Sequence, residues 1–548
     1  MIRKTVQRTI RHSPLVLINT TTGRLYDKTE QASAFMSLPI VNELVSSMTT
    51  HMDRGRIKRE IRHFFRYVML SHRWEDKEPL FPQVRYMVVY NLDKSPTHHK
   101  LQMFCKIVRD AGFNWAWSDT CCINKDDHFV LQEALVSMFK WYRGSAMTIV
   151  FLRGVPSLAK LGALVRSIWN TRAWTLQEYV ASKVIRFYTE DWTPYLNLDT
   201  FNHKESAEII SEMEEATGVS ALQLTALRPG LSSIREKLCL ASTRQTTVVE
   251  DAAYSLLGIF SAAGIPAIYG EGEGALGRLL AHILAGSGDA SVLAWTGLSG
   301  TYNSCLPAHI TVFSPSAMSH FPPPIEDAEM GTSITTLRAS ALELDVAMRL
   351  YDRLRELPTP WFAASRMKLP CIAFTLSRPV SCLTNLGLVY RVETPIFGMV
   401  EIKTKQDLSR LDSLYLVHPW LDTLLGREDM QSGVFLEDYV AEPSPSNLDN
   451  EELSDEELED DSSPRPELGS RSHPTLVDTA PMDREARALQ LVARLRQPFG
   501  PLLFTLASTR RHAVEYRRVA ADSMITVRIG ENVSLTDVLD NVGILDVL

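Results

Sequence analysis

The sequence lacks an uninterrupted hydrophobic run of the length that a membrane helix requires. Its most apolar segment, residues 252–270, contains three glycines and a proline. A helix that crosses a bilayer needs roughly 20 consecutive apolar residues without such breaks. We therefore expect a buried helix followed by a turn here, and no membrane span.

Cysteine is scarce, and no secretion signal is visible. Seven cysteines are scattered over the 548 residues, and this odd number gives no disulfide framework. Residues 1–18 contain basic side chains but no continuous apolar core of signal-peptide length. These features predict free thiols in a reducing compartment and a cytoplasmic location.

An excess of positive charge is also missing. The net charge is −8, and residues 449–461 alone carry nine acidic and no basic side chains, so the rest of the chain sums to +1. A surface built for nucleic acid would be strongly basic. We therefore expect no nucleic-acid partner, and we interpret the small basic cluster at residues 54–62 as a solvated helix face.

The composition divides the chain into several parts, because a chain of this length exceeds one ordinary core. Residues 442–482 combine the acidic run with prolines and serines, which predicts a disordered loop. Strand-like segments occur on both sides of it. They predict one β-rich C-terminal domain, formed by residues 300–441 and 483–548 and interrupted by the loop.

The first half alternates between short apolar runs and helical patterns. This alternation predicts a parallel α/β sheet with right-handed crossovers over residues 61–192, after a lead-in at 1–60 and before a helical extension at 193–299. The expected strands are 66–72, 114–119, 147–152 and 183–188, and the expected helices are 98–112, 129–145 and 171–182.

The ends of these strands predict a ligand-binding rim. In parallel sheets ligands collect at the carboxyl ends of the strands. Trp74 follows the first expected strand and Asp119 follows the second, whereas Trp174 and Glu178 lie in the helix after the third. Trp174 and Glu178 are four residues apart and should share one helix face. A solvated, salt-bridged Glu178 remains the alternative.

The same helix begins in the stretch IWNTRAWTLQE, residues 168–178. Asn170 or Thr171 is expected to cap its first turn, because short polar side chains accept hydrogen bonds from unpaired helix amides.

Residues 272–277 match the G-x-G-x-x-G pattern that binds dinucleotide phosphates. No clean strand precedes the pattern, and Glu271 and Glu273 would repel phosphate. We therefore expect a tight turn that starts a helix, with a nucleotide site as the weaker alternative.

Two further motifs have both a functional and a structural interpretation. Cys121 and Cys122 follow the second expected strand, where Cys122 could meet a substrate, but burial is the more common state of such thiols. Trp115 and Trp117 alternate along a strand and point to one face. We expect both tryptophans in the core.

Four motifs occur in order along the first part of the chain: YVMLSHRWED, WAWSDTCCINKDD, MFKWYRGSAMTIVFL and TRAWTLQEYVAS. Together they resemble the HET domain, the heterokaryon incompatibility module of fungal proteins. The resemblance continues through STRQTTVVEDAAYSLLGIF and covers roughly residues 1–300. The residues after Ser71 and the lysine at 125, where the family commonly has glutamine, depart from the usual pattern.

HET domains in turn resemble Toll/interleukin-1 receptor (TIR) domains, which implies a TIR-like (flavodoxin-like) parallel sheet. RAWTLQE resembles the segment that carries the catalytic glutamate of TIR enzymes that split NAD. The resemblance therefore implies that Glu178 is the catalytic carboxylate, that NAD is the substrate and that no metal or further cofactor is needed. It implies a substrate site formed by Ser71, Trp74, Asp119, Cys122, Arg172 and Trp174.

The family implies an effector of self/non-self recognition and programmed cell death, which hydrolyses NAD when it assembles as a homo-oligomer. The alternative is a non-catalytic adaptor that only binds other HET or TIR-like domains. A dehydrogenase that uses residues 272–277 is disfavoured, because no strand precedes that motif.

Overall fold

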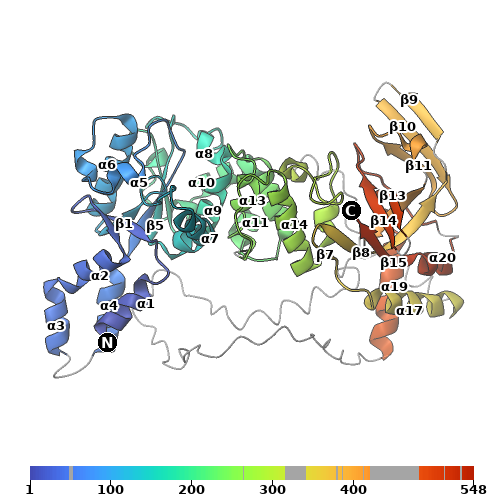
Figure 1. Cartoon of the computed structure of the whole chain (residues 1–548), viewed down its shortest axis with the longest axis horizontal. Coiled ribbons are helices and arrows are strands. Elements are labelled where there is room, and N and C mark those ends of the chain that lie inside the picture. Colours follow the sequence, from blue (N-terminus) through green and yellow to red (C-terminus); the bar gives the residue numbers. More distant parts are fainter. Residues whose placement is uncertain are drawn as a thin grey trace.

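The computed structural model describes residues 1–47, 53–262, 264–314, 341–377, 380–384, 387–411, 413–419, 481–510, 513–530 and 533–548. Figure 1 shows an elongated molecule with an α/β sheet at one end, helices in the middle and a β-rich part at the other end.

The α/β part contains a six-stranded sheet in the order β2-β1-β4-β3-β5-β6. The last four are the four predicted strands, and they pair in parallel. Across the sheet, these four strands follow the order second, first, third and fourth along the chain. The connection from β3 leads to β4 on one side of β3, and the next connection returns to β5 on its other side. The strands are β1 (Val16–Asn19), β2 (Leu25–Asp27), β3 (Tyr67–His72), β4 (Trp115–Trp117), β5 (Met147–Phe151) and β6 (Ile185–Tyr188).

Strands β1 and β2 come from the segment that the sequence suggested was only a lead-in. Strand β1 pairs antiparallel with β4 through Ile18 and Ala116, and β2 pairs antiparallel with β1. Each is only a few residues long, so neither carries enough alternation to be recognised as a strand.

Helices connect the strands and extend the sheet at its N-terminal side. The three crossover helices lie where the sequence predicted them, although the third is divided. The helices up to β6 are α1 (Ile2–Ile10), α2 (Lys28–Met36), α3 (Pro39–Ser47), α4 (Arg54–Phe64), α5 (Phe81–Val84), η1 (Val89–Asn91), α6 (Pro96–Asp110), α7 (His128–Gly144), α8 (Ile168–Thr171) and α9 (Ala173–Ala181).

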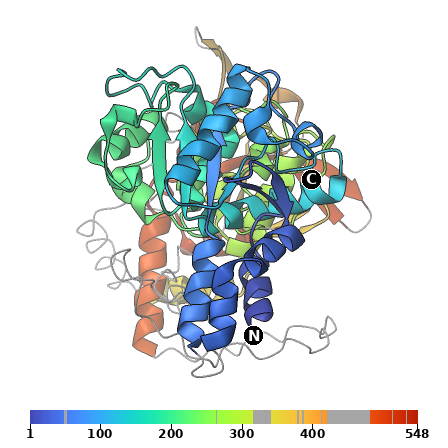
Figure 2. The same cartoon turned by 90° about the vertical axis from the view of Figure 1, so that its left-hand side faces the viewer.

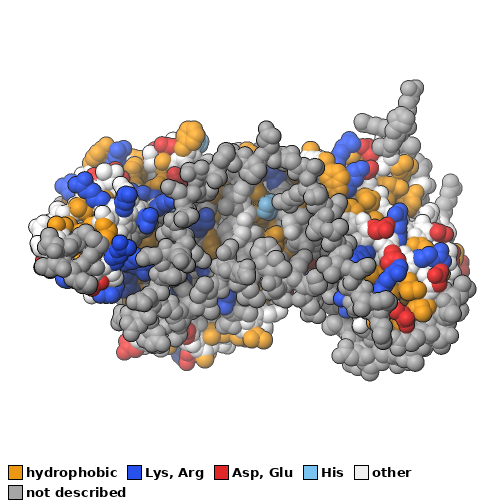
Figure 3. Space-filling model, turned by 90° about the horizontal axis from the view of Figure 1, so that it is seen from below, with side chains coloured by type: hydrophobic (Ala, Val, Ile, Leu, Met, Phe, Trp, Pro, Cys, Tyr) orange, Lys and Arg blue, Asp and Glu red, His pale blue; other side chains and the backbone are white. Residues whose placement is uncertain are grey.

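Helices α1 to α4 form a separate small bundle below the sheet (Figures 1 and 2). Val6, Phe35, Leu44 and Ile61 are among the buried side chains of its own apolar core. The basic side chains of α4 are exposed or half-buried, as expected for a solvated face. Figure 3 shows Lys and Arg side chains gathered at this end of the molecule.

The two tryptophans of β4 are core residues, as predicted. Trp115 and Trp117 are both 0% exposed. Trp115 packs edge-on against Tyr26, and Trp117 packs edge-on against Trp141 and Tyr142. These rings fill the sheet interior and are not available to stack on a nucleic-acid base.

The helical extension follows β6 and packs into the same apolar core as the sheet. No helix within the described ranges is long and apolar enough to cross a membrane. The helices of the helical extension are η2 (Tyr195–Asn197), η3 (His203–Glu205), α10 (Ala207–Thr217), α11 (Ala221–Ala226), α12 (Ile234–Ser242), α13 (Asp251–Tyr254), α14 (Gly274–Ser287), η4 (Ala290–Leu293) and η5 (Ile310–Phe313).

The glycine motif at 272–277 forms the end of the predicted tight turn and the first residues of α14, which begins at Gly274. Gly270 and Gly272 have positive φ angles of 98° and 58°, and both donate their amides to the Glu250 carboxylate at 2.7 and 2.9 Å. A Cβ atom on Gly277 would lie 2.3 Å from Tyr302. The glycines therefore serve a turn and a close packing contact, and a carboxylate already occupies the amides that a phosphate would need.

The C-terminal part contains two sheets, in the orders β11-β10-β9 and β12-β13-β14-β15-β8-β7. The elements are α17 (Ala341–Arg355), β7 (Trp361–Ala363), β8 (Arg366–Leu376), β9 (Val380–Thr384), β10 (Gly387–Thr394), β11 (Gly398–Lys403), η6 (Leu408–Arg410), β12 (Leu414–Pro419), α19 (Pro481–Leu495), β13 (Leu502–Arg510), β14 (Ala513–Val519), α20 (Leu535–Asp540) and β15 (Val542–Val547).

Strands from both sides of the acidic segment pair with each other, as predicted for one interrupted β-rich domain. Strand β12 pairs with β13, and β8 pairs with β15. Residues 442–480 of the predicted loop lie outside the described residues, and its last two residues begin α19. One of the strand-like segments after the loop, MITVRI at 524–529, forms no strand, because Val527 makes only an isolated bridge with Phe499. The final strand, β15, was missed, since its partners are distant in the sequence.

A buried arginine joins the β-rich part to the helical extension. Arg518 donates to the carbonyls of Leu293 and Trp295, both at 2.7 Å, and of Cys305 at 3.3 Å. Its guanidinium lies 3.8 Å from the centroid of the Trp295 ring. Burial lowers the pKa of Arg518 to about 10. The two parts are therefore held by charged hydrogen bonds across a shared core.

We expect Arg518→Met to lower the free energy of unfolding by about 3 kcal/mol, because three buried carbonyls lose their charged donor. Chemical denaturation followed by tryptophan fluorescence measures the change. The neighbouring Arg517 is exposed, and Arg517→Met should change stability by no more than about 0.5 kcal/mol. Equal stability of the two variants would contradict the assigned role of Arg518.

Candidate functional site

The candidate site lies at the carboxyl end of β3, where the order of the parallel strands reverses. Ligands in doubly wound sheets bind at such a position. All six residues of β3 are buried, and Ser71 is 0% exposed. Helix α9 packs against β3 and presents Glu178, which is 5% exposed. Glu178 is therefore not the solvated surface charge that was the alternative.

Glu178 is held by a short chain of hydrogen bonds. The hydroxyl of Ser71 donates to the Glu178 carboxylate, and the indole N–H of Trp169 donates to Ser71 Oγ at 2.7 Å. Trp169 is 1% exposed. The Trp169 N–H thus orients the serine hydroxyl toward the carboxylate.

Burial is the main cause of an unusual ionisation of Glu178. The pKa of Glu178 is raised to about 8, mainly by burial and in smaller part by the negative charge of Asp119. The hydrogen bond from Ser71 and the positive charges of Arg172 and Arg244 act in the opposite direction. Near neutral pH the buried carboxyl of the unliganded chain is therefore largely protonated.

A second carboxylate, Asp119, forms the other half of the site. It accepts a hydrogen bond from Trp74 Nε1 at 2.6 Å and lies 3.1 Å from His72 Nε2. Burial opposes its ionisation, but His72, the charge of Lys125 and the Trp74 hydrogen bond outweigh burial and lower the pKa of Asp119 to about 2. Its side chain keeps 23% exposure, so Asp119 is an ionised carboxylate that reaches the surface.

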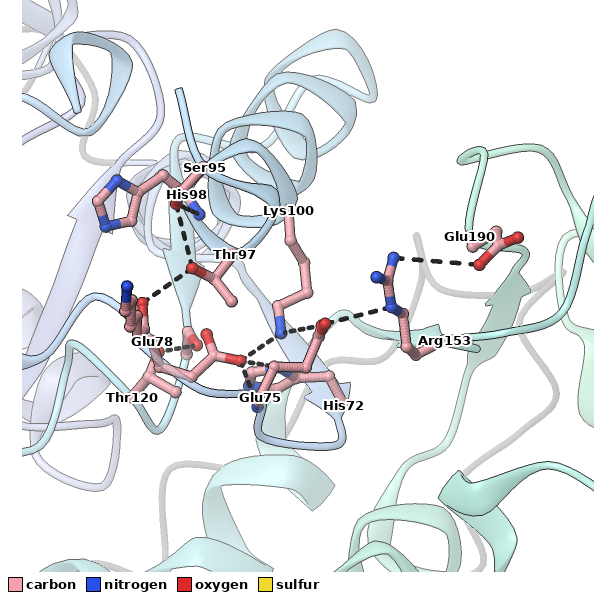
Figure 4. Close-up of polar contacts among 12 residues, drawn as sticks. His72, Glu75, Glu78, Ser95, Thr97, His98, Lys100, Thr120, Arg153 and Glu190 are labelled. Atoms are coloured by element: carbon pink, nitrogen blue, oxygen red, sulfur yellow. Dashed lines mark hydrogen bonds and ion pairs between the residues drawn. The ribbon is translucent and has the colours of Figure 1, made fainter. Parts of the chain in front are cut away.

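Figure 4 shows the ion-pair network that fixes the chain after β3. Lys100 on α6 is bonded to Glu78 and to Glu75 Oε1, the latter at 3.1 Å. Arg153, just after β5, lies 3.2 Å from Glu75 Oε2. His72 Nδ1 lies 3.8 Å from Glu78 Oε1. The network ties the loop that carries Trp74 to the ends of two neighbouring elements.

The start of α9 differs from the prediction. Neither Asn170 nor Thr171 caps the helix; the chain breaks at Arg172, which has extended backbone angles of −83° and 136°. Ala173 N donates to Gln245 O at 3.1 Å instead. The backbone around Gln245, which is distant in the sequence, thus takes the place of the expected side-chain cap. No local sequence pattern indicates this contact.

Arg244 holds this break in place and was not identified from the sequence. Its buried guanidinium donates to Asn170 Oδ1 at 3.0 Å, to the Arg172 carbonyl at 2.9 Å and to Thr175 Oγ1 at 2.8 Å. Burial lowers the pKa of Arg244 to about 10, and the charge of Glu178 opposes this shift. The only signal in the sequence was its place in the family motif STRQTT.

We expect Arg244→Met to lower the free energy of unfolding by about 3 kcal/mol, because Arg244 makes three charged hydrogen bonds around one helix start. Arg244→Lys should lie between the wild type and this variant, since lysine keeps the charge but not the planar fork. Thermal denaturation compares the three proteins. A lysine variant as stable as the wild type would show that the fork geometry is unimportant.

The remaining predicted site residues are placed less directly. Arg172 Nη1 donates to Thr247 Oγ1 at 3.4 Å, so it influences Glu178 only through its charge. Trp174 is half-buried and packs against the main apolar core.

Cys122 is not brought to the carboxylates. It is 2% exposed, and burial raises the pKa of its thiol well above the usual range. Burial thus keeps the thiol protonated and away from a substrate, in line with the structural interpretation. Six of the seven cysteines, at positions 105, 121, 122, 239, 305 and 371, are free and buried. In the described part of the chain, no group of three or more His, Cys, Asp or Glu side chains is arranged to hold a metal ion.

Comparisons with known proteins bear on the same segment. Residues 67–163 match the family model of the heterokaryon incompatibility protein (HET). This range includes Ser71, Trp74, Asp119 and Cys122 and ends before Glu178. No solved structure matches the chain significantly.

A relative from Podospora anserina, vegetative incompatibility protein HET-E-1, is 33% identical over 225 residues. The match covers 39% of this chain and 16% of the relative, so the chain corresponds to only a small part of that protein's length. The domain match and this similarity show that residues 67–163 of the chain are similar to the heterokaryon incompatibility (HET) domain family.

Proposed function

We propose that this chain is an effector of heterokaryon incompatibility that acts by hydrolysing NAD, with Glu178 as the catalytic carboxylate. The observation that carries the proposal is the buried Glu178, oriented by Ser71 at the carboxyl end of β3 and next to the charge of Asp119. A strongly shifted carboxyl group at such a rim is typical of enzyme sites.

The fold supports a TIR-like interpretation of this domain. The four parallel strands lie in the order β4-β3-β5-β6, which corresponds to the start of the flavodoxin-like order. The name of the similar protein, a vegetative incompatibility protein, supports the role in incompatibility. A cytoplasmic place of action fits a reaction that consumes NAD.

The chemistry requires a negative charge beside the ribose. When the bond between nicotinamide and ribose breaks, nicotinamide leaves with the electron pair, and positive charge develops on the sugar. Glu178, once ionised, stabilises this charge, and a water molecule adds to the sugar and releases a proton to give ADP-ribose. The cationic nicotinamide ring of bound NAD itself favours ionisation of Glu178, because an opposite charge lowers a carboxyl pKa.

Other predicted residues take supporting roles in this scheme. Ser71 orients the carboxylate, and Trp74 and Asp119 form the neighbouring wall. Arg172 adds positive charge that favours the ionised form of Glu178.

The test is release of nicotinamide from NAD by the purified full chain, measured by chromatography. The assay compares dilute protein with protein that is crowded or artificially oligomerised, because assembly is the proposed activating step. We expect equal loss of NAD and gain of nicotinamide, most rapidly in the assembled state.

The same experiment tests the adaptor alternative. An adaptor consumes no NAD in any assembly state and retains a partner that binds through the motif surface. Absence of nicotinamide release from both dilute and assembled protein would therefore overturn the enzymatic proposal and favour the adaptor.

A further inference from the structure

Lys125 occupies an unusual position beside the candidate site. Its Nζ lies 3.3 Å from the centroid of the Trp74 ring. The Nζ atom is buried, and it makes no hydrogen bond with any residue in the described part of the chain. An ammonium group has three donors and is strongly hydrated in water. This position therefore leaves the hydrogen-bonding capacity of Lys125 unused.

The surroundings explain why a positive charge is nevertheless found there. The face of an indole ring attracts cations. The Asp119 carboxylate accepts a hydrogen bond from the edge of the same ring at 2.6 Å, and it raises the pKa of Lys125 against the stronger lowering by burial. Glu78 also attracts this ammonium. An aromatic face beside an ionised carboxylate forms a site for a cation.

The two partners of the cation are held in place independently of Lys125. Trp74 is fixed by its hydrogen bond to Asp119, and Asp119 is additionally bound by His72 at 3.1 Å. The loop that carries Trp74 is anchored by the ion pairs of Glu75 and Glu78 with Lys100. If the flexible Lys125 side chain moved away, the ring face and the carboxylate would remain.

We propose that Trp74 and Asp119 form a binding site for an aromatic ring cation, and that the Lys125 ammonium occupies this site in the unliganded chain. A delocalised ring cation fits the site better than an ammonium, because it has no unused N–H donors on its charged atom and can stack flat on the indole. The pyridinium ring of the nicotinamide group in NAD is such a cation. This choice of ligand rests on the proposed function, whereas the preference for a ring cation does not.

The position of the site agrees with that role. Ser71 donates to Glu178, and the next residue of β3, His72, lies 3.1 Å from Asp119, so the cation site adjoins the proposed catalytic carboxylate. Lys125 then acts as a built-in competitor, since a ligand must displace it before it can bind.

The test uses 1-methylnicotinamide, a pyridinium cation that lacks ribose, and compares it with neutral nicotinamide. Binding to the full chain is measured by isothermal titration calorimetry. We expect Lys125→Ala to bind 1-methylnicotinamide on the order of tenfold more tightly than the wild type, because the competing ammonium is gone. Lys125→Arg should remain as weak as the wild type, since guanidinium also covers an indole face.

Two controls separate this effect from a general change in charge or folding. Lys140 is exposed on α7, and Lys140→Ala removes the same charge without opening the site, so its affinity should equal that of the wild type. Adding Trp74→Leu to Lys125→Ala should abolish the gain. Thermal denaturation shows whether each variant is folded.

Two binding results would contradict the proposed cation site. Equal affinity of folded Lys125→Ala and wild type for 1-methylnicotinamide would overturn it, as would equally tight binding of nicotinamide by Lys125→Ala. Neither result depends on catalysis. If the ring cation binds as expected but no NAD is consumed, the cation site stands and the proposed hydrolysis fails.

Discussion

Glu178→Gln is expected to lower kcat/KM for NAD hydrolysis by about 10³-fold. Glutamine keeps the size of the side chain and can still accept a hydrogen bond from Ser71, but it carries no negative charge. Loss of one preorganised electrostatic group typically costs 10²- to 10³-fold or more in rate. The measurement is initial nicotinamide release by the assembled full chain.

Stability distinguishes this loss from misfolding. Burial raises the pKa of Glu178 to about 8 in the folded chain, above the usual value of about 4.3 for glutamate. The protonated group is thus favoured by folding, and its contribution is complete below pH 4 and is lost as the pH rises to about 8. Glu178→Gln should therefore be more stable than the wild type near pH 7, by as much as about 3 kcal/mol.

Another buried glutamate provides a matched control. Glu212 is 2% exposed and accepts hydrogen bonds from Tyr195 OH at 2.8 Å and Val165 N at 3.1 Å. It belongs to α10, and Glu212→Gln should retain NAD hydrolysis. If Glu178→Gln and Glu212→Gln were equally active, Glu178 would not be the catalytic carboxylate.

The second large effect is on the pH profile. Only ionised Glu178 stabilises the developing charge, so kcat/KM should rise about tenfold per pH unit below the pKa and level off above about pH 8. The rate at pH 6 is then about 100-fold lower than on the plateau above pH 8. The free-enzyme pKa governs this quantity, because kcat/KM reports on the unliganded protein.

Two charge-removing variants should move this profile in opposite directions. Asp119 raises the pKa of Glu178, whereas Arg172 lowers it. Asp119→Asn is therefore expected to shift the rising limb to lower pH, and Arg172→Ala to higher pH. A limb that stays in place in both variants would belong to a group other than Glu178.

Local patterns predicted those parts of the site that depend on neighbouring residues. The continuous apolar strands gave the parallel sheet, and the spacing of Trp174 and Glu178 gave their common helix. Burial of Glu178 was not predictable in the same way, because a glutamate is normally exposed unless paired. Its partner Ser71 lies 107 positions earlier in the chain.

Other omissions have the same cause. The helix start at Ala173 is completed by Gln245, and Arg244 reaches Asn170 across 74 positions. Strands β1 and β15 are recognised only through the strands with which they pair. Such pairings follow from the order of strands in space, which hydrophobic periodicity does not encode.

The amino-acid sequence by itself determined the alternation of buried strands and helices, the free thiols and the ordered motifs that resemble the HET domain. The tertiary structure alone decided the electrostatics of the site. It withdrew Glu178 from water, which favours the protonated acid, and left Asp119 ionised between His72 and Trp74. It also set the Lys125 ammonium on the Trp74 ring. Ionisation depends on burial and on charges from distant segments, and both arise only when the chain has folded.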